Sequence, residues 1–102
     1  MRLRTPLTGE QVTRRLDDTG WVGDTSAIRR TFAVEYDTAL RIVAEVGKAA
    51  IELDHRPDID IRWDRLSFHM TTHTAGDVVT ELDFKLAERI NAIALRHGAV
   101  PA

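Results

Sequence analysis

The chain has 102 residues, enough for one small domain with an apolar core that needs no disulfide or structural metal. Its formal net charge is −2, and its 14 basic and 16 acidic residues are mixed along the sequence. This argues against a nucleic-acid partner, because phosphate recognition draws on clustered Lys and Arg. Without cysteine the chain has no disulfides, zinc–thiolate sites or thiol nucleophiles, and we expect it in the cytoplasm.

No apolar run is long enough to span a membrane, and residues 1–6 lack the apolar stretch of a signal peptide. No repeat or linker divides the chain. We therefore expect a single domain over residues 1–102, whose chemistry depends on imidazole, carboxylate, hydroxyl or guanidinium groups.

The first predicted element is a short helix that begins after Thr8, because Thr8 and Gln11 have the spacing of a capping box. Gly20 and Gly23 favour its end. A β-hairpin is predicted next, from strands near residues 21–22 and 28–34, which are rich in β-branched and aromatic side chains.

A second helix is predicted from the apolar residues that recur every three or four positions between Ala39 and Leu53. Asp37 is its expected N-cap. Pro57 prevents the helix from continuing beyond Arg56.

A second hairpin is predicted from the strict alternation of apolar and polar residues over 58–64 and 66–73. A two-residue turn at Asp64–Arg65 would pair Trp63 with Leu66, and would place both side chains in the core. The last helix is expected to begin at Thr80, with Asp83 at the capping-box position, and to end at Gly98.

The predicted order of elements is α-β-β-α-β-β-α. Strands interleaved with helices in this way indicate an α+β domain, in which a four-stranded antiparallel sheet carries its helices on one face.

The register of the second hairpin also predicts a site. Extended outward, it places Pro57 opposite Thr72, Arg56 opposite His73 and His55 opposite Thr74. Segments 55–57 and 72–74 would then form one wall of a pocket at a loop-rich end of the sheet, where functional residues often lie.

His55 and His73 are the candidate catalytic residues, because imidazole exchanges protons near neutral pH. His69 and His97 are interpreted as a solvated strand residue and a helix-end residue without a chemical role. A metal site is not expected, because Arg56 would repel the ion and no carboxylate completes a ligand set.

The segment Asp54-His55-Arg56-Pro57, with Trp63 six positions after the proline and Thr72-His73 beyond it, resembles the signature of the pterin-4a-carbinolamine dehydratases. The order of elements agrees with the fold of that family. The resemblance covers nearly the whole chain, and implies that 102 residues are a whole family member.

The resemblance implies the loss of water from a 4a-hydroxytetrahydropterin to give a quinonoid dihydropterin, as part of pterin recycling. It implies no metal or organic cofactor, a pterin as the small-molecule substrate, and a homodimer or homotetramer. His55 and His73 would then supply the acid and the base, in an order left open. The expected substrate-binding residues are Arg56, Pro57, Thr72, Thr74 and Ala75. Asp54 and Asp83 are possible supporting residues.

Two positions depart from the family pattern: Arg56 replaces the second histidine of His-His-Pro, and Ile51 stands where an acidic residue is usual. The alternative hypothesis is therefore a catalytically impaired, dehydratase-like protein that binds a pterin or another protein. Family members in animals also serve as dimerisation partners of a transcription factor. A nucleic-acid-binding module is disfavoured by the mixed charge.

Overall fold

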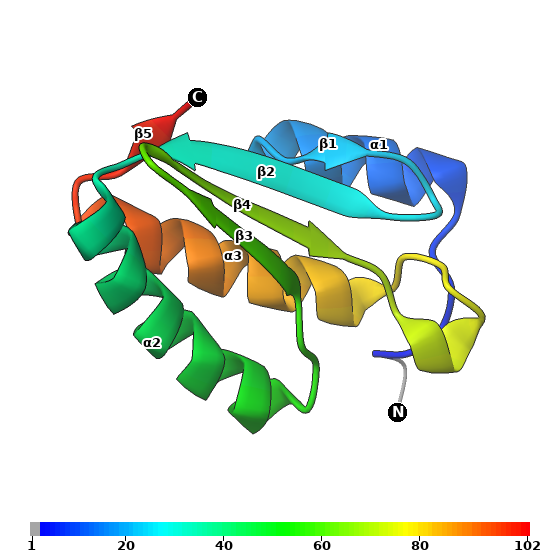
Figure 1. Cartoon of the computed structure of the whole chain (residues 1–102). Helices are drawn as coiled ribbons and strands as arrows, with labels where there is room; N and C mark the ends of the chain where they lie inside the picture. The colour runs from blue at the N-terminus through cyan, green and yellow to red at the C-terminus, as the bar shows by residue number, and fades with distance from the viewer. Residues whose placement is uncertain (1–2) are drawn as a thin grey trace.

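The computed structural model describes residues 3–102 and confirms the α+β class. Five antiparallel strands form one sheet in the order β1-β2-β4-β3, and β5 pairs with β2. The helices pack against one face of this sheet (Figure 1). In chain order the elements are α1 (Gly9–Thr19), β1 (Val22–Gly23), β2 (Ile28–Ala33), α2 (Tyr36–Leu53), β3 (Asp58–Arg62), β4 (Arg65–Met70), the 3-10 helix η1 (His73–Ala75), α3 (Glu81–Arg96) and β5 (Val100–Pro101).

The four predicted strands are present, and β5 is an addition. Val100 and Pro101 pair with Ala33 and Phe32 at the end of β2. Two residues are too few to produce an alternating pattern, so the sequence contains no signal for this strand.

Both predicted capping boxes are confirmed. Thr8 caps α1 together with Gln11, and Thr80 caps α3 together with Asp83. The prediction that Asp37 caps α2 is wrong, because the N-cap is Glu35 and Asp37 lies in the first turn. A carboxylate in the first turn is still favourable, because it faces the positive end of the helix dipole.

The second hairpin turns one residue earlier than predicted. Arg62 pairs with Arg65, Ile61 with Leu66 and Ile59 with Phe68, so the turn is Trp63–Asp64. The register is therefore shifted by two residues, and a shift of two leaves the strand side chains on their predicted faces. The predicted placement of Trp63 in the core is wrong, because Trp63 lies in the turn and is 87% exposed.

The core lies between the sheet and the helices. Trp21, buried to 2% exposure, packs near Phe68, and its indole Nε1 donates to Asn91 Oδ1 at 2.9 Å. The strands contribute Ile28, Phe32, Leu66, Phe68 and Met70, and the helices contribute Ala39, Ile42, Val46, Phe84, Leu86 and Ile90. Within residues 3–102, no helix is both long and apolar enough to cross a membrane.

Candidate functional site

The two predicted site segments do meet, but through α3 rather than by strand pairing. The pairing of β3 with β4 begins at Asp58 and His69, so residues 55–57 lie outside the ladder. Asp83, in the first turn of α3, contacts both segments: its Oδ1 lies 2.5 Å from His55 Nε2, and its Oδ2 accepts from Thr72 Oγ1 at 2.8 Å.

These three residues form a buried polar cluster. Asp83 is fully buried, Thr72 is 1% exposed and His55 is 6% exposed. Asp83 Oδ2 also accepts from the backbone N–H of Thr80 at 2.9 Å. A buried carboxylate is costly unless it is hydrogen-bonded, and both oxygens of this one have hydrogen-bond partners.

Local backbone geometry brings His55 to Asp83. Asp54 ends α2 in the left-handed conformation, with φ 51°, and turns the chain back on itself. The N–H of His55 then donates to Ala50 O at 2.9 Å, which ties the residue to the last turn of the helix.

His73 occupies a different environment. It begins η1, its side chain is 76% exposed, and its Nδ1 lies 2.5 Å from Asp77 Oδ1. Asp77 was not predicted as a site residue, although its spacing of four from His73 was the available signal.

Arg56 and Arg4 form the charged rim of the site. Arg56 Nη1 donates to Asp54 Oδ1 at 2.9 Å, whereas Arg4 donates to Thr74 Oγ1 and to Asp54 O, each at 3.2 Å. The hydrogen bond from Arg56 and the charges of Arg56 and Arg4 hold the pKa of the Asp54 carboxyl below its usual value. No pattern in the sequence pointed to Arg4, which bridges the two site segments.

The remaining predicted residues lie around this cluster. Pro57 and Ala75 are half-buried, and Thr74 is exposed. Arg56 pairs with Asp54, and His73 pairs with Asp77, so each member of the predicted Arg56–His73 pair has a carboxylate partner instead. The described residues contain no group of three or more His, Cys, Asp or Glu side chains that could hold a metal ion.

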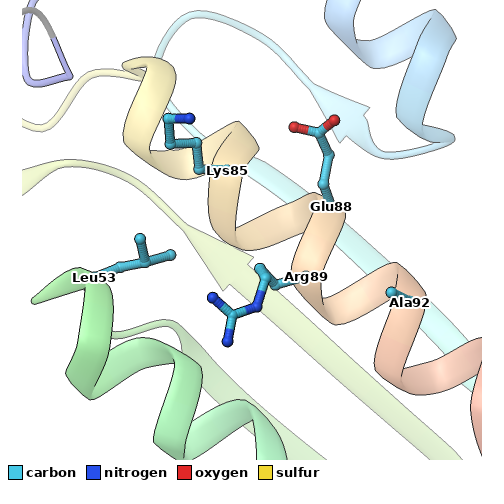
Figure 2. Close-up of a pocket in the computed structure, with 5 residues that line it drawn as sticks. All are labelled: Leu53, Lys85, Glu88, Arg89 and Ala92. Carbon is cyan, nitrogen blue, oxygen red and sulfur yellow. The ribbon is translucent and has the colours of Figure 1, made fainter.

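A separate groove of about 370 Å³ lies between the end of α2 and the middle of α3. Figure 2 shows its wall, formed by Leu53, Lys85, Glu88, Arg89 and Ala92. Arg89 bonds Glu52 at 3.1 Å across the helices. The lining contains no imidazole, so the groove lacks the proton-exchanging groups that the His55 and His73 region provides.

Comparison with known proteins gives one consistent result. Residues 5–93 match the model of the family described as Pterin 4 alpha carbinolamine dehydratase. A protein of Roseiflexus sp. (strain RS-1) is 39% identical over 93 residues, covering 89% of this chain and 99% of the relative. One from Mycolicibacterium smegmatis is 42% identical over 91 residues, covering 85% and 94%. Both carry the name pterin-4-alpha-carbinolamine dehydratase provisionally.

A solved structure agrees with these relatives. It is the crystal structure of a transcriptional coactivator/pterin dehydratase from Brucella melitensis, which superposes with a TM-score of 0.80 at 34% identity. The match covers 88% of this chain and 99% of that one.

Proposed function

Because this chain belongs to the pterin-4a-carbinolamine dehydratase family, we propose that it removes water from a 4a-hydroxytetrahydropterin to give the quinonoid dihydropterin, in cytoplasmic pterin recycling. The observation that carries the proposal is the pair of imidazoles His55 and His73, each held by its own carboxylate.

The chemistry needs two proton transfers. The C4a–O bond breaks as a general acid protonates the departing hydroxyl, while a base removes the N5 proton and the C4a=N5 double bond forms. The electrons stay within the pterin, so the step needs no redox cofactor. Positioned proton transfer of this kind is typically worth about 10²–10⁴ in rate.

Each imidazole here has an Asp partner within hydrogen-bond distance that orients the ring. Arg56 cannot act as a base, because guanidinium stays protonated. Its exposed head group beside the site is suited to donating hydrogen bonds to a pterin carbonyl, and Pro57 and Ala75 offer apolar surface to the ring.

The test is a stopped-flow measurement of dehydration of authentic 4a-hydroxytetrahydropterin. We expect the wild-type protein to accelerate the reaction, His55→Ala and His73→Ala to lose the acceleration, and His97→Ala to retain it. Pterin binding without acceleration by the wild type would overturn the proposal in favour of a binding module.

A second role, protein association, is favoured by one face of α2. Tyr36 and Leu40 are each 47% exposed and Ile51 is 68% exposed, and they lie on one stripe of the helix with Gly47. A methyl group added at Gly47 would meet nothing within 4 Å, so packing within the chain does not require this glycine.

We propose that this stripe packs against the same stripe of a second copy, to form a homodimer or part of a homotetramer. In an antiparallel pair centred between Val43 and Ala44, Leu40 lies against Gly47 of the other copy, and Tyr36 against its Ile51. Asp37 and Lys48, which flank the stripe, then approach each other with opposite charge. Light scattering should show that the wild type is a multimer and that Leu40→Glu is a monomer. A wild type that is monomeric at micromolar concentration would contradict the proposed self-association.

A further inference from the structure

The hydroxyls of Thr72 and Thr80 form a hydrogen-bonded chain that ends at the buried carboxylate of Asp83. Thr80 Oγ1 accepts from the backbone N–H of Leu82 at 3.3 Å, as the cap of α3. Its own hydroxyl proton is therefore available to Thr72 Oγ1, which lies 2.8 Å away. Thr72 Oγ1 in turn donates to Asp83 Oδ2 at 2.8 Å. Since each hydroxyl has one proton, the bonds run from Thr80 to Thr72 to Asp83.

This order shows how Asp83 is hydrogen-bonded. Oδ2 accepts from two donors, the Thr72 hydroxyl and the Thr80 N–H, so Oδ2 itself carries no proton, as in a carboxylate. An ionised carboxylate only accepts hydrogen bonds, so His55 Nε2, 2.5 Å from Oδ1, has to carry a proton. The neutral imidazole of His55 then has its lone pair on Nδ1.

Thr72 is not needed for capping. The capping box of α3 is complete with Thr80 and Asp83 alone. Thr72 lies outside that helix, at the start of the loop that its N–H closes by donating to Val78 O. Its hydroxyl is occupied by Asp83 and Thr80, in a residue that is 1% exposed. This arrangement is unsuited to the substrate contact that the family resemblance implies for Thr72, and is suited to positioning Asp83 and, through it, His55.

We propose that Thr72 and Thr80 are positioning residues that hold Asp83 as a carboxylate acceptor, so that His55 exchanges its proton with the substrate through Nδ1. The part that concerns the substrate rests on the proposed dehydration. The part that concerns the protonated nitrogen of His55 is independent of it.

The experiment compares ¹⁵N chemical shifts of the His55 ring in the full chain for the wild type, Thr72→Val and Thr72→Ser. Thr71→Val is the matched control, because that neighbouring hydroxyl donates instead to Ser26 O. We expect the wild-type ring, when neutral, to be protonated at Nε2 alone. Thr72→Val should move the two nitrogen shifts toward each other as the second tautomer appears, and Thr72→Ser and Thr71→Val should retain the wild-type pattern.

In the dehydration assay, Thr72→Val should lower kcat about tenfold with KM changed less than about twofold, as expected for partial loss of a positioned proton transfer. A wild-type ring protonated at Nδ1 would overturn the inference even if Thr72→Val does not fold. So would unchanged His55 shifts in a folded Thr72→Val. A wild type that shows the expected tautomer but no dehydration would refute the proposed function while leaving the positioning role intact.

Discussion

His73 and His55 face their carboxylates with opposite ring nitrogens. Nδ1 of His73 lies 2.5 Å from Oδ1 of Asp77, whereas Nε2 of His55 lies 2.5 Å from Oδ1 of Asp83. The nitrogens left over are therefore Nε2 of the exposed His73 and Nδ1 of the buried His55. This asymmetry is suited to the proposed reaction, in which one imidazole donates a proton to the departing hydroxyl and the other accepts the proton of N5.

His73→Ala should lower kcat by about 10²-fold or more, because one of the two proton-transfer groups is lost. Stability should change by no more than about 0.5 kcal/mol, because the side chain is exposed. Kinetics with the authentic carbinolamine and a urea titration measure the two effects. The control is His69→Ala, another exposed histidine near a carboxylate, Asp58. Equal activity of His73→Ala and wild type would remove His73 from the mechanism.

Arg56→His should raise the dehydration rate. The new imidazole can exchange a proton near neutral pH, which guanidinium cannot, and a gain of about tenfold is modest for such a group. Arg56 is exposed and bonds only Asp54 among the described residues, so the fold should be unaffected. The measurement is kcat/KM at neutral pH, with Arg62→His on β3 as the control. An unchanged rate would show that this position does not limit turnover.

Arg56→Gln should raise the pKa of Asp54 toward its usual value, because the hydrogen bond and charge from Arg56 are the largest causes of its depression. A carboxyl with a lowered pKa in the folded state stabilises the fold above its unfolded pKa, near about 3.9, and this contribution is lost as pH falls through the folded value. Wild type and variant should therefore converge in stability below about pH 4. Carbon-detected NMR titration of Asp54 checks the shift, and Arg62→Gln should leave it unchanged.

Alanine at two glycines should have opposite effects. At Gly23, with φ +144°, an added Cβ would lie 2.1 Å from the carbonyl oxygen of Ala27, so we expect a loss of about 1–3 kcal/mol or more. At Gly47, inside α2, a Cβ meets nothing, so Gly47→Ala should stabilise the monomer by about 1 kcal/mol. Urea unfolding at low protein concentration measures both. Stabilisation by Gly23→Ala would contradict the turn geometry.

Local signals predicted most of the fold. The capping residues Thr8 and Thr80, the end of α2 before Pro57 and the alternation along β4 each depend on neighbours in the sequence. The hairpin register was missed because a shift of two residues keeps the same faces buried, so alternation cannot distinguish the two registers.

The sequence predicted that segments 55–57 and 72–74 lie close together, but not the contacts that connect them. His55, Thr72 and Asp83 are far apart in the sequence, and their contact depends on where α3 packs against the sheet. The predicted strand pairing placed these two segments side by side, whereas in the structure they meet through Asp83 of α3. Arg4 and Asp77 complete the surroundings through loop contacts that have no periodicity.

The two tryptophans are fluorescent probes of two different parts of the molecule. Trp21 is enclosed in the core and hydrogen-bonded to Asn91, whereas Trp63 stands in solvent at the hairpin tip. The buried Trp21 should therefore emit at shorter wavelength, and its emission should change when the protein unfolds. The exposed Trp63 should emit at longer wavelength, and its emission should change when another molecule binds at the hairpin tip. Trp63→Phe would leave a single-tryptophan protein whose fluorescence follows the fold alone.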